Sequence, residues 1–384
     1  MRENHALNLC RIGFAGHPLP DRADFSLLMP ATIKRGNIEG VGEAPKLAGN
    51  GGRGHAASTQ KPKSKSKHTK PSAYYATVFP GKMAPLPVQF AKGILALEKM
   101  LGGFPIWLVV QPSCPNCGLG AGQIENQLFL AFEREYLKMP QGKPVGLLIE
   151  SIGGDAHTAY RIGRLLQRRS GNNVTAIIPQ RAKSAATLMA LCAKQIILGP
   201  NAELGPLDVQ MFDSQKEEYG SALDAVQSLE CLNAFGMAAA DQVLRIMQDA
   251  TEKRTDVLLP HVMNYVTQFM RPLLERIDIV DYTLKSRELR VAEEYAVRLL
   301  AKNHQGDERR IAKQLVENYP THGFSIVQEE AATGQEEGGL GLNIISMGDK
   351  AKKFEGIVDG LLPYLCLPYF HGMPPFVIGR ILCQ

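Results

Sequence analysis

The chain contains 384 residues, of which 45% are hydrophobic and 21% are charged. This composition is typical of a globular protein and excludes the collagen-like, fully disordered and disulfide-scaffold classes. The formal net charge is +5, yet residues 1–75 alone carry 12 Lys and Arg residues against 5 Asp and Glu residues. The rest of the chain is therefore close to neutral, and the basic excess belongs to the N-terminal segment.

Residues 1–75 have the pattern of a disordered basic tail. Seven of the nineteen residues from 36 to 54 are glycine, and a run rich in Lys and Ser follows between Lys61 and Lys70. Such a segment buries too little apolar surface to offset the entropy lost on ordering. We favour a solvated leader, and contact of the basic run with nucleic acid is the alternative.

The chain has seven cysteines, and this odd number favours reduced thiols in the cytoplasm over a secreted disulfide framework. Cys114 and Cys117 form a CxxC pair, but no second pair follows to complete a zinc site. We favour a turn with two thiols over a metal or redox role, and we expect no metal and no cofactor. The apolar run 361–379 contains four prolines, which argue against a membrane-spanning helix and leave peripheral membrane association as an alternative.

Hydrophobic spacing predicts the elements in chain order. Helices are expected at 88–101 and 123–139, with a buried strand at 106–110 between them. A strand–turn–helix–strand–helix–strand series follows, at 145–150, 151–155, 155–169, 173–179, 184–193 and 195–199. Short connections between strands and helices in this order predict a parallel sheet with right-handed crossovers, in an α/β fold.

The second half of the chain is predicted to be helical. Long amphipathic helices are expected at 221–252, 256–277 and 286–303, with Pro260 and Pro272 interrupting the second. Shorter elements follow at 309–318, 326–332 and 338–345. We therefore expect one folded domain over 76–345 and an apolar, Pro-rich C-terminal extension over 346–384.

Two turns in this series have the composition of a catalytic site. Gly153 and Gly154 follow a predicted strand, where their main-chain N–H groups could converge on a bound oxyanion, although a plain tight turn is the alternative. Ser184 stands at the predicted start of a helix, flanked by Ala182, Ala185 and Ala186. Small neighbours at such a turn expose a nucleophile, whereas a simple N-cap serine is the alternative.

The two turns together resemble a known family. The segments Ser151-Ile-Gly-Gly-Asp155, 182–193, 199–210 and Tyr319-Pro-Thr-His-Gly-Phe324 are similar, in order and spacing, to the serine dehydrogenase proteinase family. That family is related to signal peptide peptidase A and the Clp proteases. One departure is Ile152, where the related enzymes commonly have proline before the two glycines.

The resemblance implies a Clp protease/crotonase-like fold of stacked ββα units, here with additional long helices. It implies Ser184 as the nucleophile and the N–H groups of Gly153, Gly154 and Ala185 as oxyanion donors. It also implies a polypeptide substrate and a homo-oligomer. The long helices after 221 would cover the core and mediate contacts between subunits.

The general base is left open by the sequence. Clp proteases place a histidine in the segment corresponding to 204–208, which has none here, and signal peptide peptidases use a lysine. His322, in the Tyr-Pro-Thr-His-Gly motif, is the first candidate. The alternatives are Lys183 and His157, while Lys216 and Lys253 have no distinctive spacing. Asp208 either orients the base or caps a turn.

The resulting hypothesis is a serine peptidase that forms an acyl-enzyme on Ser184. Three alternatives remain, and each makes a different demand on the residues. A crotonase-like acyl-CoA enzyme would need the oxyanion site without the serine, and a non-catalytic scaffold with the Clp fold would need neither. A nucleic-acid-binding module would depend on the basic tail.

Overall fold

The structure is a computed structural model that describes residues 73–78, 82–111, 123–137, 141–213, 218–368 and 370–383. Three features singled out in the sequence lie outside these residues. They are residues 1–72 of the expected basic tail, the Cys114–Cys117 pair and Lys216. Residues 71–384 form one compact unit.

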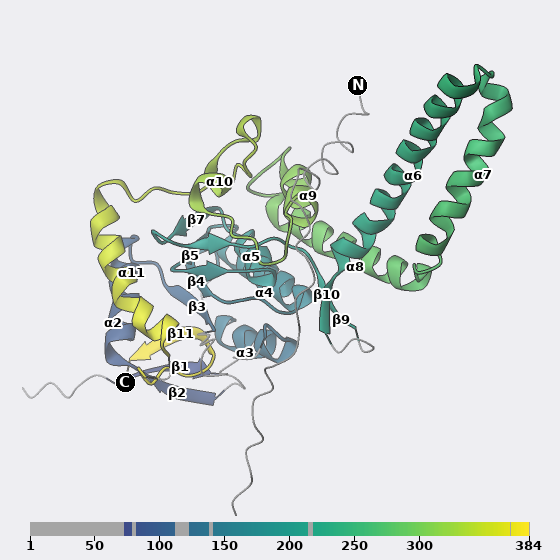
Figure 1. Ribbon diagram of the computed structural model, residues 1–384. Coiled ribbons are helices and arrows are strands. Elements are labelled where there is room, and N and C mark those ends of the chain that lie inside the picture. Colours follow the sequence, from purple (N-terminus) through teal and green to yellow (C-terminus); the bar gives the residue numbers. More distant parts are fainter. Residues whose placement is uncertain are drawn as a thin grey trace, which may run out of the picture. The chain divides into compact units, whose positions relative to one another are not determined.

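A seven-stranded mixed sheet lies at the centre of this unit, in the order β2-β1-β11-β3-β4-β5-β7 (Figure 1). Four strands are parallel to one another: β3 (Ile106–Val110), β4 (Val145–Glu150), β5 (Val174–Ile178) and β7 (Gln195–Leu198). Antiparallel pairs join β2 (Lys82–Leu86), β1 (Tyr74–Val78) and β11 (Val377–Cys383) to β3. The parallel pairing that the sequence predicted is therefore confirmed.

Helices cover both faces of the sheet. On one face, α2 (Val88–Met100) packs against α11 (Ala351–Cys366). The other face is covered by α3 (Asn126–Tyr136), α4 (Ala156–Ser170), α5 (Ala185–Ala190), α8 (Ile279–Leu300) and α9 (Glu308–Glu317). Successive residues of β4 alternate between the two cores, since Leu147 and Ile149 face one and Leu148 faces the other. The predicted α/β class, with a Clp-like arrangement and additional helices, is confirmed.

The stretch after residue 345 supplies two elements of this layered arrangement. Strand β11 lies between β1 and β3, while α11 covers the sheet beside α2. Pro363 lies inside α11, and Pro368, Pro374 and Pro375 precede β11, so the strand itself contains no proline. The domain division expected at 345 remains a prediction.

Two separate two-stranded sheets accompany the main sheet. One pairs β6 (Arg181–Ala182) with β8 (Glu203–Leu204), and the other pairs β9 (Gln210–Asp213) with β10 (Glu218–Ser221). Both lie in the segments that connect β5 to the long helices. They fix the path of the loops that carry the candidate site.

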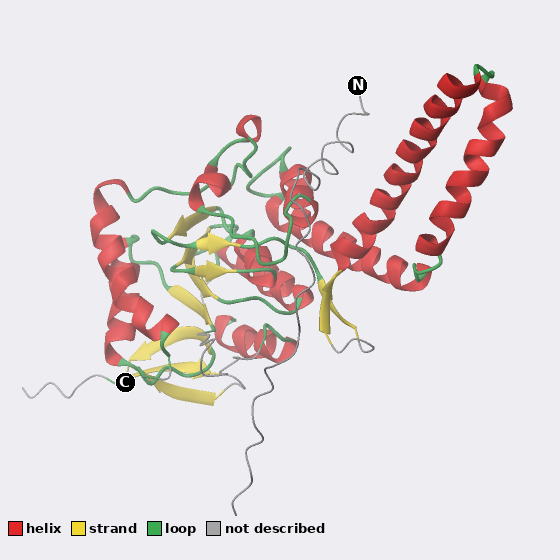
Figure 2. Cartoon of the chain, viewed as in Figure 1, coloured by secondary structure: helices red, strands yellow, loops and turns green. Residues whose placement is uncertain are grey.

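Two long helices, α6 (Ala222–Thr251) and α7 (Thr255–Leu274), lie side by side (Figure 2). Their contact is a small apolar core centred on the buried side chains of Val262, Val266 and Met270. Helix α7 continues through both Pro260 and Pro272, so the expectation that these prolines interrupt it is wrong. The short helix α10 (Gln328–Ala332) follows α9. Among the described residues, no helix is both long and apolar enough to cross a membrane.

Candidate active site

Ser184 stands at a sharp turn between β6 and α5. Its backbone has φ 51° and ψ −121°, a conformation that costs a residue with a side chain about 1–3 kcal/mol. Its hydroxyl makes no capping hydrogen bond to α5, so the N-cap role is not adopted. The turn leaves half-buried Ser184 with no side-chain hydrogen bond to another described residue, as at a strand-to-helix nucleophile elbow.

The turn that carries Ser184 is joined to the glycine turn by main-chain hydrogen bonds. The N–H of Ser151 donates to the oxygen of Arg181 at 3.0 Å, and the N–H of Lys183 donates to the oxygen of Ser151 at 3.0 Å. These bonds extend the parallel pairing beyond the ends of β4 and β5. The two motifs that the sequence placed after successive strands therefore lie side by side.

Both glycines occupy positions that a side chain would obstruct. A β-carbon at Gly153, where φ is 107°, would stand 2.8 Å from the oxygen of Lys183. At Gly154, where φ is 145°, it would stand 2.3 Å from the main-chain nitrogen of Ile124. Glycine is thus required here by both dihedral angle and close approach. The isoleucine at residue 152 leaves this turn intact.

The main-chain N–H groups of the site differ in whether they already donate a hydrogen bond. That of Gly153 donates to the hydroxyl of Ser151 at 3.1 Å, and this hydroxyl donates in turn to Oε1 of Gln111 at 2.7 Å. Those of Gly154 and Ala185 have no acceptor among the described residues. Two of the three expected donors, one from each turn, are therefore available to an oxyanion.

His322 is held in one tautomer by a main-chain carbonyl. Its Nδ1 lies 2.8 Å from the oxygen of Asp208, and because a carbonyl only accepts, Nδ1 carries the proton. The lone pair is then on Nε2, where a general base needs it. The buried carboxylate of Asp208 accepts from the N–H of Leu223 at 3.3 Å and also from the hydroxyl of Ser221.

The environment of Asp208 changes its ionisation. Burial raises the pKa of the Asp208 carboxyl, while hydrogen bonds from Ser221 and Leu223 and the positive charge of His322 oppose the increase. The interaction with His322 is attractive when the ring is protonated. An imidazolium formed during a reaction would therefore have a counter-charge close by.

Eight of the residues singled out in the sequence line a single cavity of about 610 Å³, whereas Lys253 is exposed between α6 and α7. The eight are Gly153, Gly154, His157, Lys183, Ser184, Ala185, Asp208 and His322. Apolar side chains of Ile124, Leu188, Leu207 and Val291 form much of the remaining wall. Among the described residues, no group of three or more His, Cys, Asp or Glu side chains is placed to hold a metal ion.

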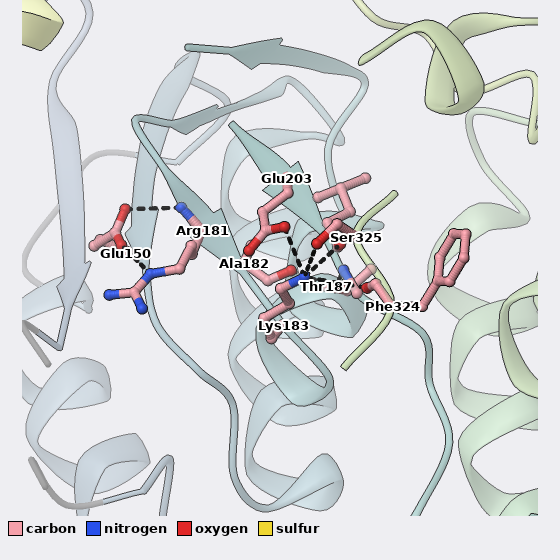
Figure 3. A network of polar contacts seen from close by, with 10 residues as sticks. Glu150, Arg181, Ala182, Lys183, Thr187, Glu203, Phe324 and Ser325 are labelled. Carbon is pink, nitrogen blue, oxygen red and sulfur yellow. Dashed lines mark hydrogen bonds and ion pairs between the residues drawn. The ribbon is translucent and has the colours of Figure 1, made fainter. Parts of the chain in front are cut away.

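The two alternative bases are engaged elsewhere. Nζ of Lys183 forms an ion pair with Oε2 of Glu203 at 3.0 Å (Figure 3). The exposed His157 has its Nδ1 2.7 Å from the hydroxyl of Tyr295 on α8. Of the three candidates, His322 alone combines a place in the cavity wall with a ring nitrogen fixed by a main-chain carbonyl.

The structure adds residues that sequence reasoning missed. Glu288, Val291 and Ala292 of α8 line the cavity, although the apolar period of that segment predicted only a helix. Glu150, the last residue of β4, is completely buried and accepts from Nε of Arg181 at 3.3 Å. Burial raises its pKa to about 7, partly opposed by hydrogen bonds from Arg181 and Gln180. The sequence signal that could have identified Glu150 is a charged residue at the end of a predicted buried strand.

Residues 132–272 match the model of a family described as ClpP-like SDH-type serine proteinase. The family that the motifs indicated is thereby confirmed for this part of the chain, which contains both turns. The match ends before His322.

Two relatives are uncharacterized proteins of Methanocaldococcus jannaschii. One is 27% identical over 194 residues, 50% of this chain and 52% of the relative. The other is 32% identical over 114 residues, 30% of this chain and 35% of the relative. The chain thus spans about half the length of one and a third of the other.

Proposed function

We propose that this chain, whose residues 132–272 match the ClpP-like SDH-type serine proteinases, hydrolyses peptide bonds through an acyl-enzyme on Ser184. The hydroxyl of Ser184 attacks the scissile carbonyl, and Nε2 of His322 takes its proton. His322 then gives this proton to the leaving amine. A water molecule, activated in the same way, releases the acyl group from Ser184.

The negative oxygen of the tetrahedral intermediate is stabilised by main-chain donors. In our proposal the N–H groups of Gly154 and Ala185 supply the two hydrogen bonds, because both are without an acceptor among the described residues. Gly153 has a supporting part, since its N–H is tied to Ser151. This tie holds the turn that presents the N–H of Gly154.

Asp208 assists His322 through two groups. Its main-chain oxygen fixes the ring by accepting from Nδ1 at 2.8 Å. Its carboxylate, whose pKa is raised by burial and partly lowered again by the positive charge of His322, stabilises the imidazolium formed during the attack. The proposed triad thus uses a carbonyl, rather than a carboxylate, as the acceptor of the Nδ1 proton.

One observation carries the proposal: a serine strained at φ 51° lines the same cavity as a histidine whose Nδ1 is engaged by a carbonyl. The test combines a fluorophosphonate probe with hydrolysis of unfolded casein. We expect the probe to label Ser184, located by peptide mass spectrometry, and Ser184→Ala to abolish labelling and hydrolysis. Ser228→Ala removes an exposed hydroxyl on α6 and should change neither.

The competing functions give different results in this experiment. An acyl-CoA enzyme of the crotonase class would bind acyl-CoA and keep its activity in Ser184→Ala. A non-catalytic scaffold would neither react with the probe nor hydrolyse casein. Binding of nucleic acid would depend on residues 1–75 and weaken steeply with salt. Any of these outcomes, without labelling of Ser184, would overturn the peptidase proposal.

We also propose that the chain assembles into a homo-oligomer through α6 and α7. Beyond Leu223, α6 has no fully buried residue. Five large apolar side chains on the two helices are half or more exposed: Phe235, Met237, Ile246, Val257 and Tyr265. Exposed apolar side chains gathered on neighbouring helices are typical of protein interfaces.

A further inference from the structure

The side chain of Lys183, the residue before Ser184, reaches into a group of oxygen atoms (Figure 3). Its Nζ lies 3.0 Å from Oε2 of Glu203, 3.1 Å from the oxygen of Phe324, 3.3 Å from the oxygen of Leu204 and 3.4 Å from Oγ of Ser325. Only 14% of the side chain is exposed. An ammonium group surrounded by acceptors on several segments acts as a cross-link.

Three segments meet at this point. The backbone of Ala182, in β6, pairs with that of Leu204, in β8. Leu204 and Ile326 exchange two main-chain hydrogen bonds of 2.9 and 3.0 Å. These segments lead, within four residues, to Ser184, Asp208 and His322 respectively. The nucleophile, the proposed base and the carbonyl that fixes the base are thus carried on three adjoining backbones.

Lys183 joins the first of these segments to the other two through its side chain. The bond to Phe324 is the important one, because Phe324 lies only two residues after His322. The main-chain pairing at Ile326 fixes the loop two residues further on. The His322 loop is thus held at Ile326 and at the bond from His322 to Asp208. Between these two points, the bond from Lys183 to Phe324 connects the loop directly to the Ser184 turn.

The same contacts argue against Lys183 as the general base. A base needs a neutral amine with its lone pair directed at the serine hydroxyl. Here the nitrogen instead forms an ion pair with Oε2 of Glu203 at 3.0 Å, away from the serine hydroxyl. Its remaining neighbours are two carbonyls and a hydroxyl, which accept hydrogen bonds from an ammonium.

We propose that Lys183 is a positioning residue, whose ion pair with Glu203 and hydrogen bonds to the His322 loop set the distance between Ser184 and His322. This inference rests on the proposed peptidase function. It assigns to the residue beside the nucleophile the task of holding the serine and the histidine at a fixed distance from each other.

Arginine distinguishes the two roles of residue 183, because it keeps the charge and the donors but cannot give up its proton. We expect Lys183→Met to lower kcat for casein-derived peptides about 100-fold, as a displacement near 1 Å does, with KM within about two-fold. Lys183→Arg should recover most of this loss. If Lys183 were the base, Lys183→Arg would be as inactive as Lys183→Met. Wild-type kcat in Lys183→Met would overturn the positioning role.

The pH dependence of labelling by the fluorophosphonate supplies a second readout. With His322 as base, Lys183→Met should react more slowly at every pH but lose reactivity on acidification in the same way as wild type. If the fall in reactivity on acidification disappeared in Lys183→Met but persisted in His322→Gln, Lys183 would be the base. Lys313→Met removes an exposed ion pair on α9 and should match wild type throughout.

The position of His322 is also measurable without any activity. The imidazole signals of His322 in NMR spectra should shift in Lys183→Met and stay unchanged in Lys313→Met. If Lys183→Met does not fold, Glu203→Gln, which removes only the partner charge, should shift the same signals. Unchanged signals in the folded variants would overturn the inference, even if Ser184 proved to have no peptidase activity.

Discussion

Gly153 lies directly against Ser184: a β-carbon at residue 153 would stand 2.9 Å from the β-carbon of the serine. The two turns of the site therefore touch through a glycine and a serine, with no room for a methyl group between them. Contact of this kind makes the position of Ser184 depend on the residue at 153.

Gly153→Ala should displace Ser184 and strain its own backbone at φ 107°. We expect kcat to fall about 100-fold and the free energy of unfolding to fall by about 1–3 kcal/mol. Gly171→Ala is the matched control, because φ is 65° there but nothing lies within 4 Å of the new methyl group. It should lose about 1 kcal/mol and keep its kcat. Urea unfolding measures the stability of both variants, and peptide hydrolysis measures their kcat. Equal kcat values for Gly153→Ala and Gly171→Ala would contradict the dependence of Ser184 on the residue at 153.

Ser184→Gly should be more stable than Ser184→Ala, although we expect neither variant to be active. Alanine keeps the β-carbon that makes φ 51° costly, while glycine adopts that angle freely. We expect a difference of about 1 kcal/mol in the free energy of unfolding. If alanine were equally or more stable, the backbone of Ser184 would not be strained.

His322→Gln should lower kcat by about 10²- to 10⁴-fold, the usual contribution of a general base. His157→Gln should have little effect, since His157 is exposed and its Nδ1 is engaged with Tyr295. Far-UV circular dichroism checks that both variants fold. The reverse order of effects would assign the base to His157.

The parallel strands were predictable because their signal is local. The expected strands 106–110 and 145–150 coincide with β3 and β4, since each is a short apolar run bounded by turn residues. Successive parallel strands also bring their C-terminal turns to one edge, so the glycine turn and Ser184 were expected together. The family resemblance added their roles.

The base and the C-terminal strand depended on long-range packing. The bond between His322 and Asp208 joins residues 114 positions apart, and no spacing rule connects them. Nor does the sequence around 377–383 reveal that β11 lies between β1 and β3. Lys183 was named as a candidate base because signal peptide peptidases use a lysine, but the direction of its side chain depends on Glu203 and Phe324.

The proposed assembly predicts that charge on the surface of α6 weakens association. Met237→Glu combined with Ile246→Glu places two charges on side chains that are more than half exposed, so the subunit fold should survive. We expect sedimentation velocity to show an oligomer for wild type and smaller species for the double variant. Met83→Glu, on β2, is the control and should sediment as wild type. A monomeric wild-type protein would contradict the proposal.

The buried carboxyl of Glu150 predicts a pH-dependent stability. Burial raises its pKa in the folded protein from 4.5 to about 7. The fold therefore binds a proton that the unfolded chain releases above pH 4.5. Below that pH both states are protonated and the stabilisation is complete, and it is lost as the pH rises to about 7. The difference amounts to about 3 kcal/mol at 1.36 kcal/mol per pKa unit.

Glu150→Gln should remove this dependence, because an amide does not titrate between pH 4.5 and 7. Its oxygen still accepts from the N–H groups of Gln180 and Arg181, which the carboxylate holds at 3.1 and 2.9 Å. Only the slope between the two pH values is diagnostic, since the variant also leaves Arg181 without its buried counter-charge. Urea unfolding at intervals of half a pH unit gives that slope. The same slope in both proteins would show that Glu150 is already ionised in the fold at pH 5, with Arg181 outweighing the effect of burial.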